Sequence, residues 1–151
     1  MNNLNSIENE LKHGRSVMVN TKGISMRPLL WQGKTHVYIS PLSKPLKIGD
    51  LPLVKLKPGI SRLHRIVKMD ETGIFTRGDN CVALEKVEQE SIIGVVTEIY
   101  CGNKKIDMEG IGYRFYTAFW LKTAPIRIFV YLVRNKIIGA IMRIATYLRK
   151  K

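Results

Sequence analysis

Cysteine and histidine are scarce in this chain of 151 residues, which contains two cysteines and three histidines. Two cysteines exclude a disulfide-rich scaffold, and we expect Cys81 and Cys101 to be separate thiols in a reducing compartment rather than a pair. Neither has a cysteine or histidine partner at metal-ligand spacing, and no glycine-rich nucleotide motif occurs. We therefore expect neither a metal site nor a cofactor.

Long apolar segments are also missing from the chain. No run of roughly 18 apolar residues occurs, which argues against a conventional transmembrane helix. Residues 1–12 are polar and lack the apolar stretch of a signal peptide. Both absences predict a protein that stays in the cytoplasm.

Acidic side chains are absent from residues 113–151, a segment that holds nine basic ones. The whole chain has a formal charge of +13, but residues 1–112 hold 16 basic and 12 acidic side chains and are close to balanced. The excess charge therefore belongs mostly to the C-terminal segment. In this segment, basic residues alternate with short apolar runs. Polar side chains that could hydrogen-bond to nucleotide bases do not accompany them, so we expect no nucleic-acid partner.

Hydrophobic residues make up 45% of the chain, enough for a compact domain. After a helix expected over residues 5–13, short β-leaning segments alternate with turns rich in glycine and proline, among them residues 25–28 and 57–59. We expect strands over residues 16–22, 35–40, 51–56, 61–69, 74–77 and 92–100. The fold class is therefore mostly β with a helical C-terminal appendage, and residues 1–112 form a small antiparallel β domain.

Residues 113–151 form a second region, a basic amphipathic helical tail. Residues 113–121 and 125–148 are compatible with helices, and a break near residues 135–139 would give two shorter helices, each with a cleaner apolar side. This pattern favours helices that lie at the surface of an anionic membrane, so we expect peripheral attachment at the inner membrane surface. The alternative is that the helices pack on the β domain or on a protein partner.

Three residues in the β region have the chemistry of a hydrolase site. Ser25 lies between Gly23 and Pro28 on a constrained turn, His64 lies in an apolar strand, and Asp79 follows on a turn. A hydroxyl nucleophile, an imidazole base and an orienting carboxylate are the parts of a serine hydrolase. Taken singly, each residue is more simply a turn or strand residue of a β domain.

The order of the surrounding motifs carries more information than the single residues. Five blocks occur in sequence: Gly23-Ile-Ser-Met-Arg-Pro-Leu29, Ile48-Gly-Asp-Leu-Pro-Leu-Val54, Leu63-His-Arg-Ile-Val67, Arg77-Gly-Asp-Asn80 and Ile93-Gly-Val-Val96. Together they resemble the signal peptidase family and, more broadly, the superfamily of serine proteases that also contains the self-cleaving repressors. The resemblance covers residues 17–100 and implies a small barrel-like antiparallel β domain of the signal peptidase and repressor protease type.

The resemblance assigns roles to individual residues. Ser25 is the implied nucleophile, and His64 stands where bacterial leader peptidases have a lysine base, as in the endoplasmic-reticulum and archaeal enzymes. Either Asp79 or Glu85 would orient the histidine, and the alternatives stay open. Asp50 belongs to the Gly-Asp block of the resemblance, and we expect its side chain to brace a turn.

The implied oxyanion hole uses backbone N–H groups of Ser25 and Gly23, since Gly23 has no hydroxyl to donate. We also expect no N-terminal membrane anchor of the kind usual in signal peptidases. The implied function is a serine endopeptidase that cleaves a leader, signal or precursor peptide through an acyl-enzyme. The alternative is a catalytically inactive module on the same fold that binds peptides or membranes.

Overall fold

The computed structural model describes residues 4–57 and 59–149 of the chain, without the side chain of Leu148. Pro58, in the middle of the turn expected over residues 57–59, and Lys150 and Lys151 of the tail lie outside the described residues. The chain forms two compact units, Met1–Ala118 and Phe119–Lys151. The boundary expected from the sequence follows residue 112.

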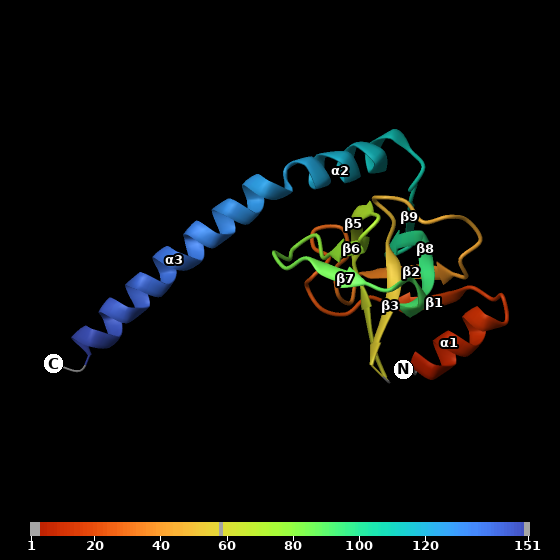
Figure 1. Cartoon of the computed structure of the whole chain (residues 1–151), viewed down its shortest axis with the longest axis horizontal. Coiled ribbons are helices and arrows are strands. Elements are labelled where there is room, and N and C mark those ends of the chain that lie inside the picture. The colour runs from red at the N-terminus through yellow and green to blue at the C-terminus, as the bar shows by residue number, and fades with distance from the viewer. Residues whose placement is uncertain (1–3, 58, 150–151) are drawn as a thin grey trace. The chain divides into compact units, whose positions relative to one another are not determined.

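A larger antiparallel sheet forms most of the first unit (Figure 1). Its strands, in spatial order, are β1 (Val17–Asn20), β2 (Thr35–Ser40), β8 (Ile92–Cys101), β3 (Pro52–Lys57) and β4 (Ile60–Leu63), and β9 (Lys104–Ile106) pairs with β8. Alternate residues of β2, such as Val37 and Ile39, point into the core, as the strand period requires. The order leaves β1 and β4 as the two terminal strands of the path.

Helix α1 (Leu4–Lys12) covers this sheet with one apolar face. Its apolar residues at helical spacing, Leu4, Ile7 and Leu11, are all buried. A Cβ atom at Gly94 on β8 would lie 2.8 Å from Ile39 and 3.1 Å from Leu11, so the glycine lets helix and strand approach closely. The helix expected over residues 5–13 is thus confirmed within one residue at each end.

A second, three-stranded sheet consists of β5 (Arg65–Asp70), β6 (Gly73–Arg77) and β7 (Glu85–Val87). The single strand expected over residues 61–69 is wrong, because β4 ends at Leu63 and β5 begins at Arg65 in the other sheet. The reason lies in the core. Leu63 packs against the apolar cluster of the larger sheet, whereas Ile66 belongs to the cluster of the smaller one. His64 is the residue at which the chain changes sheet.

Two helices follow the β region: α2 (Ile111–Lys122), which spans the division between the compact units, and α3 (Ala124–Leu148). The break considered near residues 135–139 does not occur, because α3 continues through them. A single glycine at position 139 costs a helix only about 1 kcal/mol, which the good helix formers around it outweigh. Within the described part of the chain, no helix combines the length and apolar character needed to cross a bilayer.

The coarse expectation of a small antiparallel β domain followed by helices is therefore confirmed. Strands β7 and β9 were not expected, because each has three residues and is mainly polar. Both cysteines are free.

Candidate active site

Ser25 lies on a turn that follows β1, and backbone bonds hold this turn against a distant segment. Gly23 has a φ of 80°, a left-handed conformation that glycine adopts without strain. The Asn80 N–H donates to the Ser25 carbonyl at 2.8 Å, and the Asn80 side-chain amide donates to the Ile24 carbonyl at 3.3 Å. The Gly78-Asp-Asn turn therefore positions the backbone of the candidate nucleophile.

At Gly78 the Gly78-Asp-Asn turn lies against both the Ser25 turn and the His64 side chain. A Cβ atom there would lie 2.6 Å from the Ser25 carbonyl oxygen and 3.0 Å from Nε2 of His64. The first distance is shorter than real Cβ contacts and the second is tighter than most of them, so a larger residue here displaces its neighbours. The imidazole Nε2 and the Ser25 backbone thus lie within 3.0 Å of one common point.

His64 is buried at the junction of the two sheets and is oriented by Glu85. Its Nδ1 lies 3.2 Å from Glu85 Oε2, and the other carboxylate oxygen pairs with Arg62. Because a carboxylate only accepts hydrogen bonds, Nδ1 carries the proton and Nε2 keeps its lone pair. Burial lowers the pKa of His64; the negative charge of Glu85 opposes this and Arg62 adds to it. The imidazole is therefore neutral near pH 7, the form that a general base needs.

Asp79 belongs to a different network. Arg65 donates to both of its carboxylate oxygens, at 2.8 and 2.7 Å, and both side chains are almost wholly buried. The Tyr116 hydroxyl, from α2, donates to Asp79 at 2.9 Å. Burial and then the Asp79 charge raise the pKa of Tyr116, so this hydroxyl stays protonated. Of the two carboxylates left open by the sequence, Glu85 contacts His64, while Asp79 binds the elements around the site together.

Asp50 braces a turn, as the sequence indicated. Its carboxylate accepts the Lys47 N–H at 2.9 Å, and its carbonyl accepts the Ile66 N–H at 2.9 Å. Together with the bond from Arg65 to the Gly49 carbonyl at 2.9 Å, these contacts fix the start of β5. They therefore fix the residue that follows His64.

No hydrogen bond joins the Ser25 hydroxyl to His64, although the structure describes both residues. Catalytic hydrogen bonds are often long in an empty site and shorten when substrate binds. In this structure Nε2 and the Ser25 carbonyl oxygen both lie beside the Cβ position of Gly78.

The two N–H groups expected to form an oxyanion hole differ in their hydrogen bonding. The Gly23 N–H donates to the Gln32 side-chain oxygen at 3.0 Å, so it is already engaged. The Ser25 N–H has no hydrogen-bond partner among the described residues. Gln32, which the sequence did not single out, therefore holds the turn at the position from which the second donor was expected. Its separation of nine residues from Gly23 gives no sequence signal.

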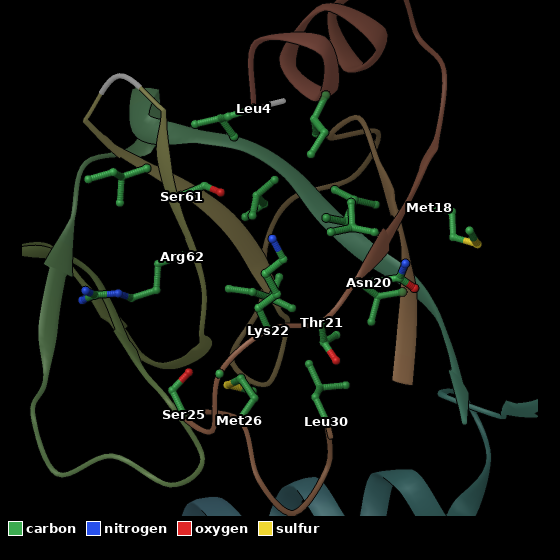
Figure 2. Close-up of a pocket in the computed structure, with 18 of the residues that line it drawn as sticks. Leu4, Met18, Asn20, Thr21, Lys22, Ser25, Met26, Leu30, Ser61 and Arg62 are labelled. Carbon is green, nitrogen blue, oxygen red and sulfur yellow. The ribbon is translucent and has the colours of Figure 1, made fainter. Parts of the chain in front are cut away.

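A cavity of about 760 Å³ adjoins Ser25 and separates the terminal strands β1 and β4 (Figure 2). Figure 2 shows the Ser25 hydroxyl directed into it, with Met26 and Leu30 beside it and Arg62 on the β4 side. Buried apolar residues form one wall: Leu30, Val37, Ile39 and Leu53. The sequence did not reveal this cavity, because it depends on how the sheet curves.

Comparison with protein-family models, with curated sequences and with solved structures gives no match. No group of three or more metal-ligating side chains occurs among the residues that the structure describes. Function is therefore inferred from the geometry of the site.

Proposed function

We propose that this protein is a serine endopeptidase of the signal-peptidase-like superfamily that cleaves a leader or precursor peptide. One observation carries the proposal: a buried, neutral His64, held by Glu85 through Nδ1, directs its other nitrogen to the point where the Ser25 turn meets Gly78. Nucleophile turn, base and orienting carboxylate come from three separate segments, the arrangement that serine hydrolases require.

The chemistry follows from these positions. His64 Nε2 removes the hydroxyl proton of Ser25, and the oxygen attacks the scissile carbonyl to form a tetrahedral oxyanion beside the Ser25 N–H. The same proton passes to the leaving amine as the peptide bond breaks, leaving an acyl-enzyme. Water, deprotonated by His64, then releases the acyl group. The Glu85 carboxylate stabilises the imidazolium formed in each step.

The cavity supports an extended peptide as substrate. It lies between strands β1 and β4, whose outer edges pair with no further strand of the larger sheet among the described residues. Such edges bind an extended chain through main-chain hydrogen bonds, with alternate side chains facing the wall. The apolar wall favours apolar side chains near the cleaved bond.

The finer fold assignment, a barrel-like domain of the signal peptidase and repressor protease type, belongs to the same proposal. It is supported by the places of the motifs. The serine block forms a turn after the first strand, the histidine lies at a change of sheet, and the Gly-Asp-Asn turn packs against the serine.

The experiment is replacement of the nucleophile in cells. Ser25→Ala and His64→Ala should each cause the uncleaved precursor to accumulate, detected by mass spectrometry of the small proteins. Ser43→Ala, in an exposed loop, is the matched control and should process normally. Normal processing in Ser25→Ala cells would refute the assignment.

The alternative is a non-catalytic module that binds peptides in the same cavity. The absent Ser25–His64 hydrogen bond favours this reading. Such a module would bind a peptide with equal affinity in the wild type and in Ser25→Ala, and would leave it uncut in both.

A further inference from the structure

Helix α3 exposes apolar side chains on more than one face, and six of them form a stripe along its length. The members recur three or four residues apart, which places them on one helix face: Ile126, Val130, Val133, Ile137, Ile141 and Ile144. Each is between 39% and 66% exposed in the structure. Such a continuous apolar face on a helix requires a partner.

Basic residues border this stripe on both sides. At about 100° per residue, Arg127 and Arg134 lie along one edge, and Lys136 and Arg143 lie along the other. This arrangement exists because α3 is continuous through residues 135–139, which keeps both halves of the stripe in register. Long basic side chains at such positions extend their charged ends toward a polar surface while their stems cover apolar area.

The positive charge of residues 113–151 indicates which kind of partner can cover this face of α3. In a coiled coil built on the stripe, the four basic residues would take the positions that flank the apolar seam. A second copy of the chain would present the same cations, since residues 113–151 contain no acidic side chain. A second copy is therefore repelled, whereas an anionic surface is attracted to both edges.

We propose that this face of α3 binds the surface of an anionic lipid bilayer, with the helix axis parallel to the membrane. The apolar stripe enters the interface, and Arg134 on one edge and Lys136 and Arg143 on the other reach the headgroups. Within the described residues no helix can span a bilayer, and a surface position agrees with that finding. The proposal concerns α3 alone and does not depend on whether Ser25 is catalytic.

Two adjacent isoleucines provide a matched pair of variants. Ile137 lies at the centre of the stripe, and Ile138, which follows it, is rotated by about 100° out of the stripe. The side chains are 55% and 45% exposed. Ile137→Asn and Ile138→Asn cost the helix the same intrinsic propensity, so a difference between them reports on the face and not on helix stability.

The full chain is mixed with vesicles of phosphatidylcholine alone or of phosphatidylcholine with phosphatidylglycerol, and the bound fraction is measured by flotation. We expect binding to the anionic vesicles that weakens with salt, and little binding to the neutral ones. Ile137→Asn should bind about tenfold more weakly, because it removes one isoleucine that the bilayer would bury. Ile138→Asn should change binding less than about twofold. Lys136→Gln and Arg143→Gln should each lose about fivefold.

Several outcomes would overturn the proposal: no binding to anionic vesicles, equal binding to neutral ones, or equal losses in the two isoleucine variants. Sedimentation showing a dimer that Ile137→Asn dissociates would assign the face to a second copy. Tighter binding to duplex DNA, unchanged by Ile137→Asn, would assign the charge to nucleic acid. Circular dichroism confirms that each variant remains folded, and unchanged vesicle binding by Ser25→Ala separates this result from that of the proposed catalysis.

Discussion

At the scale of single residues, His64 combines burial with one carboxylate contact. Burial lowers the pKa of His64 from its usual 6.5, although Glu85 opposes the shift. The proposed proteolysis needs the neutral imidazole, so kcat/KM should fall as the pH falls through this lowered value. The acid limb of the pH profile, measured with a cleavable peptide, should therefore have its midpoint below about 6.5.

Replacing Glu85 tests the origin of this midpoint. Glu85→Gln removes the charge that raises the pKa of His64, so the acid limb should move to lower pH while kcat decreases, because the imidazole loses its orienting partner. Glu88→Gln, an exposed neighbour, should leave the profile unchanged. A limb that moves to higher pH in Glu85→Gln would contradict the assignment.

The same shift affects stability. Because the folded protein holds His64 with a lowered pKa, the unfolded chain binds its proton more readily. The free energy of unfolding should therefore decrease as the pH falls below about 6.5. This part of the pH dependence should be absent from the His64→Gln variant. Denaturant titrations at several pH values measure this difference.

Gly78 allows a test of packing at the site. Gly78→Ala places a Cβ atom against the Ser25 carbonyl and against Nε2 of His64. We expect a loss of about 1–3 kcal/mol in the free energy of unfolding and a larger relative loss of activity, because the nucleophile turn is displaced. Gly112→Ala, in helix α2 with open space around it, is the control and should stabilise slightly. Unchanged activity in Gly78→Ala would show that the three segments do not act together.

At the scale of elements, helix α2 is bound to the Gly78-Asp-Asn turn through Tyr116 and Asp79. Tyr116→Phe removes the hydroxyl and leaves Asp79 with one donor fewer. The free energy of unfolding should fall by about 1 kcal/mol, and kcat should fall by a smaller factor than in His64→Ala. Tyr38→Phe, on β2, provides the comparison, and thermal melts with peptide cleavage measure both effects. An equal change in the two variants would contradict this role for Tyr116.

Elements were predictable where local pattern determines them. The helix at residues 5–13 and the strand at 35–40 follow from the spacing of their apolar residues, and the structure has them at almost those bounds. The change of sheet at His64 was not predictable, because it depends on the two separate cores that receive Leu63 and Ile66. The break considered near residues 135–139 is absent because one glycine is too weak a signal to end a long helix.

The candidate site, too, was only partly predictable from the sequence. The motif order placed Ser25, His64 and the two acidic candidates, but the sequence left Asp79 and Glu85 as alternatives. Only the structure shows that a buried arginine, Arg65, neutralises Asp79, whereas Glu85 lies beside the imidazole. Gln32 and Tyr116 were missed because contacts between distant segments carry no local pattern.

At the scale of the whole molecule, the formal charge of +13 divides between two regions with different chemistry. The β region carries the candidate active site, and α3 carries a basic-edged apolar face. Deleting residues 123–151 should therefore leave peptide cleavage in solution intact and abolish binding to anionic vesicles. Loss of both activities together would show that the two compact units are interdependent, against this expectation.

The central claim is that Ser25 is an activated nucleophile, and covalent labelling tests it most directly. The full chain is treated with a fluorophosphonate, which phosphonylates the oxygen of reactive serines with loss of fluoride, and the modified peptide is located by mass spectrometry. We predict a single adduct on Ser25 that is absent from Ser25→Ala and strongly reduced in His64→Ala, with Ser43→Ala labelled like the wild type. No adduct on Ser25 at pH 7–8, or equal labelling with and without His64, would contradict the account.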